Sequence, residues 1–311
     1  MNNFFPTNES ENIFVSSRGI MKSCNYYSLQ PISSIKFIHN YPNFDIFIKK
    51  YISSNKIPII YVCSSAIANF ILYYLNKIPF KFILVSGDCD EDIPNEIFAS
   101  RKEYLNFINN DKLVHWYCQN FITLHKKITI IPIGLDYHTM QKTKIFWGPL
   151  TNSNNQEYLL QNIIKKSKPF YERKIKCYSN FHFTMNTKHG YDRKNAYTQI
   201  PTNLVYYEKN KVNRISTWMT QKNYAFVISP HGGGYDCHRT WEALVLGCIP
   251  IVKKSKIDNL YKDLPVLILD DWDQLNHELM ETTIKEFKNM NFNMKKITLK
   301  YWVDKINNIV D

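Results

Sequence analysis

The chain has 311 residues, which is enough for two domains of about 150 residues each. Hydrophobic residues make up 44% of it and aromatic residues 15%, a composition that excludes a disordered or fibrous protein. The formal net charge of +12 favours a polyanionic partner, such as nucleic acid, acidic lipid headgroups or a nucleotide-sugar diphosphate. Because the lysines are scattered and form no tract of five basic residues, a dedicated nucleic-acid-binding arm is disfavoured.

The cysteines and the N-terminus bear on location. The seven cysteines lie far apart and form no C-x-x-C pair, so we expect reduced thiols in a cytoplasmic protein and no structural zinc site. Residues 1–10 lack the basic and apolar regions of a secretory signal. Residues 57–75 carry no charge and are long enough to suggest a membrane span, but Pro58, the Ser64-Ser65 pair and Asn69 favour a strand followed by a helix.

Short apolar runs separated by polar turns and helix-like segments predict an α/β fold with parallel sheets covered on both faces. The predicted strands are 57–63, 82–86, 174–178, 204–207, 224–229, 249–252 and 266–269. The polar, turn-forming residues 151–156 are the predicted domain boundary, which gives domains of residues 1–150 and 151–311.

The end of the chain predicts a packing helix. Apolar residues recur there at helical spacing, which indicates one buried face. They are Leu299, Trp302, Val303, Ile306 and Val310. In the two-domain scheme this helix is free to pack back on the N-terminal domain.

The richest segment is YAFVISPHGGGYDCHRTWEALVLGCIPIV, residues 224–252. A buried strand ends at Ser229-Pro230, and the three glycines that follow suit a tight turn whose backbone approaches a phosphate closely. Asp236 is the predicted N-cap of a helix over 237–246, and Gly247 is the predicted left-handed residue after it.

This helix has two predicted faces. Its apolar stripe should pack against the sheet, and it consists of Trp241, Leu244, Val245 and Cys248. Arg239 and Glu242 lie off that stripe, one turn apart. A nucleotide diphosphate would fit there, with its phosphates at the helix N-terminus and Arg239 and its ribose hydroxyls on Glu242. The alternative is an ordinary i,i+3 ion pair on a solvated face.

The segment resembles the donor site of the exostosin-like glycosyltransferases, over roughly residues 223–272. The resemblance rests on Pro230-x-Gly232, Arg239, Glu242-Ala243 and Gly247-Cys248-x-Pro250. It implies a GT-B fold, in which two Rossmann-like domains face each other across a cleft. It also implies sugar transfer from a nucleotide donor, commonly a uridine diphosphate sugar, without a catalytic metal. The chain shows no membrane anchor and no disulfide pattern, so a secretory-pathway location and a heparan-type acceptor do not follow.

An inverting transferase needs a base that reaches the acceptor hydroxyl. Asp88 is the first candidate and Asp90 the second, because both follow the predicted strand 82–86; plain solvation of an acidic loop is the alternative. Residues 131–138 indicate a strand ending in a turn that brings Asp136 and His138 to the interdomain side, where either could meet a substrate or could serve the turn alone.

Further cationic residues could stabilise the leaving diphosphate, which is the main route open to an enzyme without a metal. Arg173, Lys176 and Arg193 are candidates, with surface solvation as the alternative. His231 adjoins Gly232, Gly233 and Gly234 and could donate to phosphate or to the donor sugar.

The sequence therefore predicts a metal-independent, inverting glycosyltransferase with no cofactor besides its nucleotide-sugar co-substrate. Its expected acceptor is a hydroxyl group on a glycan, a glycoprotein or another compound. A non-catalytic nucleotide-sugar or phosphate-binding protein, a basic nucleic-acid binder and a peripheral membrane transferase stay open as alternatives.

Overall fold

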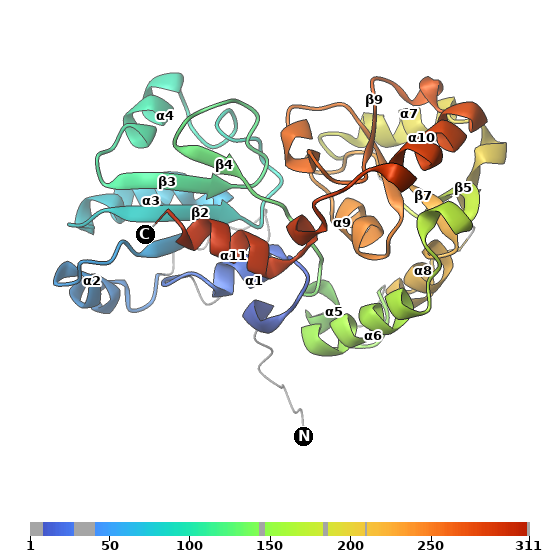
Figure 1. The fold of residues 1–311 in the computed structure, drawn as a ribbon. Coiled ribbons are helices and arrows are strands. Elements are labelled where there is room, and N and C mark those ends of the chain that lie inside the picture. Colours follow the sequence, from blue (N-terminus) through green and yellow to red (C-terminus); the bar gives the residue numbers. More distant parts are fainter. Residues whose placement is uncertain (1–8, 28–40, 143–146, 183–185, 209, 310–311) are drawn as a thin grey trace.

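The computed structural model describes residues 9–27, 41–142, 147–182, 186–208 and 210–309. Two α/β units lie side by side, each built on one parallel sheet (Figure 1). The predicted α/β class with two Rossmann-like sheets is thus confirmed. Residues 1–8 of the segment inspected for a secretory signal, and Val310 of the predicted last helix, lie outside the described residues.

The N-terminal sheet has the strand order β1-β2-β3-β4, which is also the order along the chain. Its strands are β1 (Ile59–Cys63), β2 (Phe82–Gly87), β3 (Leu113–Cys118) and β4 (Ile128–Ile130). The helices of this part of the chain are α1 (Ser17–Lys22), α2 (Phe44–Ile52), α3 (Ile67–Tyr73), α4 (Arg101–Ile108) and α5 (Thr139–Lys142). The sequence analysis did not predict β3 or β4.

Alternating side chains of β1 and β2 pack into two cores, one on each face of this sheet. Ile60 and Leu84 join the aromatic core under α2, α3 and α4. Tyr61 and Val85 face the other way and pack with residues of α1 and of the last helix, α11 (Leu299–Asn307). The Tyr117 hydroxyl donates to the Lys305 carbonyl at 2.7 Å, so the end of the chain lies against the N-terminal sheet (Figure 1).

The C-terminal sheet has the order β6-β5-β7-β8-β9. Its strands are β5 (Lys174–Ser179), β6 (Val205–Tyr207), β7 (Tyr224–Ile228), β8 (Ile249–Lys253) and β9 (Leu267–Leu269). The helices are α6 (Ser153–Lys165), α7 (Gly190–Gln199), α8 (Arg214–Gln221), α9 (His238–Val245) and α10 (His277–Asn289). All five strands agree with the predicted ranges within three residues at each end.

One local expectation is wrong and another is confirmed. Residues 153–156, predicted as a turn-forming linker, are the first turn of α6, because the Asn152 side chain caps that helix by accepting from Asn155 N. The charge-free stretch 57–75 divides into β1 and α3, as the sequence predicted. Within the described ranges, no helix combines the length and the apolar character needed to cross a bilayer.

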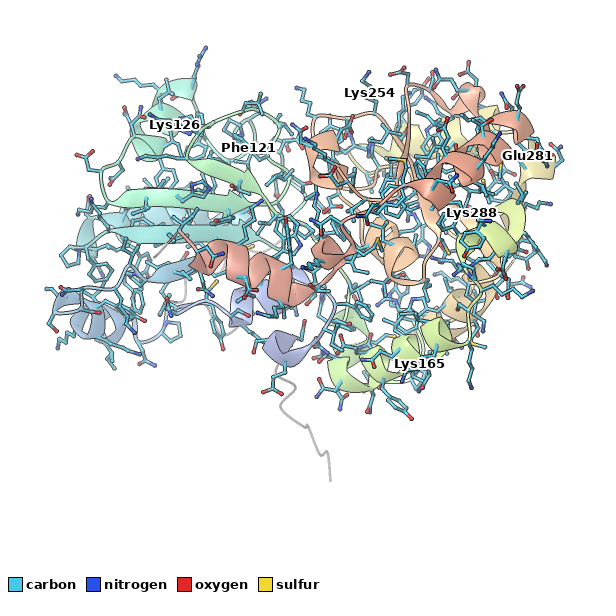
Figure 2. All side chains as sticks on the ribbon, viewed as in Figure 1. Phe121, Lys126, Lys165, Lys254, Glu281 and Lys288 are labelled. Atoms are coloured by element: carbon cyan, nitrogen blue, oxygen red, sulfur yellow. The ribbon has the colours of Figure 1, made fainter. Side chains whose placement is uncertain are left out.

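Lysines project from both units of the molecule (Figure 2). Lys126 is exposed on the N-terminal unit, and Lys165, Lys254 and Lys288 are exposed on the C-terminal one. The positive charge is therefore spread over the surface, as the scattered lysine groups of the sequence indicated.

Candidate functional site

The C-terminal sheet has a topological switch point between β5 and β7. From β5 the chain passes to β6 on one side and then returns to β7 on the other. Ligands of open parallel sheets bind beyond the carboxyl ends of the strands at such a point, because the following loops diverge there. The segment after β7 contains the glycine turn, residues 232–234, so the structure places it at this position.

The three glycines are needed because no room is left for a side chain at their positions. A side chain on Gly232 would meet the Arg193 guanidinium at 2.6 Å, one on Gly233 the Asp90 carboxylate at 2.0 Å, and one on Gly234 the Asn120 amide at 2.7 Å. None of the three has a left-handed φ, which Gly247 does have at +71°, as predicted. The glycine turn is thus a place of close approach between both halves of the chain.

Asp236 does not cap α9, contrary to the prediction. The N-cap is Cys237, and Asp236 is buried one residue earlier. Its carboxylate accepts from Ile133 N at 2.7 Å, Trp241 Nε1 at 2.8 Å and the Tyr261 hydroxyl at 3.1 Å. Burial raises its pKa to about 6. Asp236 therefore pins the loop after β4 to the start of α9.

The apolar stripe of α9 is buried as predicted, and Arg239 lies off it. Arg239 Nη2 donates to the Pro230 carbonyl at 2.7 Å, and its guanidinium lies 5.7 Å from the centre of the Phe181 ring. Pro230 follows β7 and Phe181 follows β5, so Arg239 bridges the switch point. Burial lowers its pKa.

Arg193, on α7, is the second guanidinium at this place. It donates to the carbonyl oxygens of His231 at 3.3 Å and His182 at 3.1 Å. In the described part of the chain, neither Arg193 nor Arg239 forms an ion pair with a carboxylate. Two guanidinium groups thus lie beside the glycine turn, with Asp90, Asp192 and Glu242 close enough to interact with them electrostatically but not in direct contact.

Glu242 lies one turn further along α9, in a buried ionic group. Its Oε1 is 3.5 Å from Arg214 Nε, and Arg214 Nη2 is 3.0 Å from Asp136 Oδ2. The Arg214 side chain also donates to the Asp136 carbonyl and lies 4.8 Å from the centre of the Trp147 ring. Burial alone would raise the pKa of Asp136, but Arg214 and neighbouring histidines hold it well below its usual range. The alternative interpretation of the sequence, an i,i+3 ion pair of Glu242 with Arg239, is wrong, because Glu242 pairs with Arg214.

His138 and Asp136 form a hydrogen-bonding pair on the N-terminal side. His138 Nδ1 is 3.0 Å from Asp136 Oδ1, and the His138 ring lies 5.9 Å from that of His238, the first residue of α9. His238 in turn contacts the Gly134 carbonyl at 2.7 Å through Nδ1. The structure therefore brings His138 next to the N-terminus of α9. The preceding residues 131–134 are not in a strand, since β4 ends at Ile130.

The two acidic residues after β2 that the sequence proposed as a base differ in their contacts. Asp88 is held by Arg18 at 3.3 Å, and its backbone N donates to Gln119 Oε1 at 2.9 Å. Asp90 lies directly against Gly233; although the residue as a whole is exposed, partial desolvation of its carboxylate by the surrounding loops raises its pKa. Of the two, only Asp90 touches the glycine turn.

His231 is buried and fixed by an acid. Its backbone N donates to Asp192 Oδ2 at 2.8 Å and its Nδ1 lies 3.2 Å from the same oxygen, while Trp272 Nε1 donates to Asp192 Oδ1 at 2.7 Å. Burial lowers the pKa of His231 to about 4. Burial therefore favours the neutral form of His231, against the opposite effect of Asp192.

Arg173 does not join the other predicted residues. Its Nη2 donates to the Leu246 carbonyl at 2.9 Å and its Nη1 lies 3.2 Å from Cys248 Sγ. These acceptors follow the C-terminal end of α9, so Arg173 lies at the other end of the helix from the glycine turn. It neutralises the negative end of the α9 dipole.

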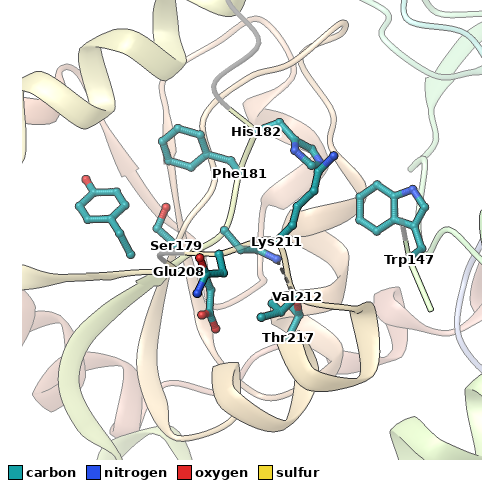
Figure 3. A pocket seen from close by; sticks show the side chains of 11 residues that line it. Trp147, Ser179, Phe181, His182, Glu208, Lys211, Val212 and Thr217 are labelled. Carbon is teal, nitrogen blue, oxygen red and sulfur yellow. Dashed lines mark hydrogen bonds between the residues drawn. The ribbon is translucent and has the colours of Figure 1, made fainter. Parts of the chain in front are cut away.

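A cavity of about 200 Å³ opens at the carboxyl ends of β5 and β6 (Figure 3). Aromatic and cationic side chains line it, among them Trp147, Phe181, His182 and Lys211. Phe181 and Trp147 also contact Arg239 and Arg214, which connects the cavity to the switch point. Sequence reasoning missed this cavity, although polar and aromatic residues directly after the strand 174–179 were a usable signal.

Among the described residues, no group of three or more His, Cys, Asp or Glu side chains is placed to hold a metal ion. No protein-family model matches the chain, and no curated protein matches it. Among solved structures, the chain is similar to one titled "Crystal Structure of alpha1,3-Fucosyltransferase". The identity is 12%, the match covers 83% of this chain and 90% of that chain, and the TM-score is 0.37. The exostosin-like resemblance is not confirmed by these comparisons.

Proposed function

We propose that the protein is a glycosyltransferase that moves a sugar from a nucleotide diphosphate to a hydroxyl acceptor. The observation that carries this proposal is the pair Arg193 and Arg239, which lie beside the glycine turn and form no ion pair within the described residues. Guanidinium groups that are not in direct contact with a carboxylate, at a switch point and a helix N-terminus, suit a diphosphate, which would accept charge-assisted hydrogen bonds from them. The expectation of a uridine diphosphate sugar comes from the sequence resemblance.

The base and the ribose of a nucleotide donor would also find complementary side chains near the glycine turn. The cavity beside Trp147 and Phe181 offers aromatic rings to the base of the nucleotide. Glu242 is the proposed acceptor for the ribose hydroxyls, and Arg214 fixes the position of its carboxylate. The diphosphate would then lie at the glycine turn, and the sugar would point toward the loops of the N-terminal unit.

His138 is the proposed base, in preference to Asp88 and Asp90. His138 Nδ1 lies 3.0 Å from Asp136 Oδ1, and with the Nδ1 proton directed at that acid, Nε2 is the proposed basic nitrogen, the arrangement by which an acid orients a catalytic histidine. Asp88 is already paired with Arg18. Asp90 lies against Gly233, where its carboxylate would approach the donor phosphates.

The proposed reaction is a single in-line displacement with inversion. His138 takes the proton of the acceptor hydroxyl, the acceptor oxygen bonds to the anomeric carbon, and the bond from that carbon to the phosphate oxygen breaks. The diphosphate leaves with both bonding electrons, and its charge is balanced by Arg193, Arg239 and the amides at the start of α9. No metal is needed in this scheme, and a cytoplasmic location is proposed with it.

The test is a binding and turnover screen of the purified protein in EDTA against uridine and guanosine diphosphate sugars. We expect one nucleotide class to bind and its sugar to be released slowly to water. Arg239→Ala should weaken binding about 100-fold, because a buried charge-assisted pair of bonds is lost. Glu242→Ala should weaken it less.

Arg173→Ala is the matched control, since it removes an arginine from the other end of the same helix. Equal losses of nucleotide affinity from Arg239→Ala and Arg173→Ala would show a general disturbance of α9. The assignment of the donor site to the glycine turn would then be wrong. Binding without any turnover would instead identify a nucleotide-sugar-binding protein.

A further inference from the structure

Helix α2 and its neighbour α3 carry exposed apolar side chains where a soluble domain usually has polar ones. In α2, Phe44, Phe47 and Tyr51 are buried against the N-terminal sheet, while Ile46 and Ile52 are 66% and 63% exposed. In α3, Leu72 and Tyr73 are 65% and 58% exposed. Single exposed hydrophobic residues need no explanation, but four on two adjacent helices form a group.

The two helices are packed against each other. The Phe44 ring of α2 lies 6.5 Å from that of Phe70 and 5.3 Å from that of Tyr74, and both contacts are edge-to-face. The two helices that carry the exposed residues are therefore neighbours in the N-terminal unit. In Figure 1, α2 lies at the end of that unit that is turned away from the C-terminal sheet.

The charge of this region is mainly positive. Residues 41–87 contain five lysines and a single acid, Asp45. Lys49 and Lys50 lie three and four residues after Ile46, so all three project from the same side of α2, and all three are exposed. Lys56 follows the helix, and Lys77 and Lys81 follow α3; these are exposed as well.

We propose that this basic and apolar face of α2 and α3 docks on an anionic phospholipid surface. Lysines around exposed isoleucine and leucine side chains are the composition of a helix that lies in a membrane interface, where the apolar groups enter the acyl boundary and the lysines meet anionic headgroups. Nucleic acid fits less well, because it would leave Ile46, Ile52 and Leu72 without an apolar contact. The inference is independent of the proposed sugar transfer.

The test is co-sedimentation of the full chain with phosphatidylcholine vesicles, with and without phosphatidylglycerol. Binding should require the anionic lipid and fall in about 1 M NaCl, where the Debye length is about 3 Å. The double variant Lys49→Glu/Lys50→Glu should weaken binding about tenfold or more, as expected from the contribution of each lysine at an anionic surface. Ile46→Ser/Ile52→Ser should weaken it with no change in net charge.

The control is Lys165→Glu/Lys166→Glu, which changes the net charge equally at the C-terminal end of α6, on the other unit (Figure 2). Both lysine pairs are exposed near helix ends, so neither double substitution should unfold the protein. A melting curve of each variant checks that the two are equally stable. Equal losses from the two lysine pairs would overturn the proposal in favour of unspecific charge. Vesicle binding that is unchanged by Ile46→Ser/Ile52→Ser would also overturn the proposal. The same holds if an oligonucleotide displaces the protein from vesicles and this competition depends on Lys49 and Lys50.

Discussion

The carboxyl-terminal rims of the two sheets differ in how they satisfy their polar groups. At the N-terminal rim, Arg18 is paired with Asp88, and Gln119 both accepts from Asp88 N and donates to the Pro132 carbonyl. At the C-terminal rim, Arg193 and Arg239 donate to backbone carbonyl oxygens. The first rim pairs its arginine with a carboxylate, whereas among the described residues the second has carboxylates near its arginines, Asp90 and Asp192, but none within ion-pair distance of them.

The difference follows from topology. The strands of the N-terminal sheet are in chain order, so consecutive loops leave its rim on the same side and can bond to one another. The order of the C-terminal sheet reverses between β5 and β7, so its loops diverge and leave room for a ligand. Positive charge matters most for function where topology leaves it unpaired.

The largest expected effect is a loss of turnover without a loss of nucleotide affinity. His138→Gln should lower turnover about 100-fold or more, the usual contribution of a general base, and leave nucleotide affinity unchanged. Turnover and nucleotide affinity measured on the same samples test this, with His277→Gln on the exposed start of α10 as the control. If Asp90→Asn abolishes turnover and His138→Gln does not, the base has been misassigned.

A second pair of variants compares the rims directly. Arg18→Ala should lower the free energy of unfolding by about 3 kcal/mol, because it removes the guanidinium that is paired with the buried Asp88 carboxylate. It should not change nucleotide affinity. Arg239→Ala should do the reverse, with a clear loss of affinity and a much smaller change in stability, since it strands no carboxylate. Urea unfolding and calorimetric titration of both variants measure this, and matching stability losses would contradict the comparison.

The smallest effect concerns Asp236, which connects the rims. Its pKa is raised from 3.8 to about 6, so the folded state holds the proton more tightly than the unfolded state. Its stabilising contribution is therefore present below about pH 4 and is lost as the pH rises to about 6. The unfolding free energy of the wild type, taken relative to Asp236→Asn, should fall by about 2 kcal/mol over that range. A difference that stays constant with pH would contradict the raised pKa.

The sequence alone determined much of the C-terminal unit. Its five strands, the buried stripe of α9 and the left-handed Gly247 follow from local rules, because apolar runs, helical spacing and glycine geometry act over a few residues. Local pattern also placed the glycine turn and Arg239 together. It failed for β3 and β4, whose strands lack an unbroken apolar run: β3 contains His115, and β4 has only three residues.

Tertiary structure decided the partners of the charged residues. Arg173 and Arg193 look alike in sequence, yet the first lies beyond the C-terminal end of α9 and the second beside the glycine turn. Glu242 pairs with Arg214, 28 positions away, and Asp236 bonds to Ile133, across the two units. Such contacts depend on the strand order of each sheet and on how the carboxyl-terminal rims of the two sheets pack together. Neither property can be recognised from the spacing of residues in the sequence. The sequence therefore predicts a segment for a donor, and only the fold shows which of its charged residues have no carboxylate in direct contact among the described residues.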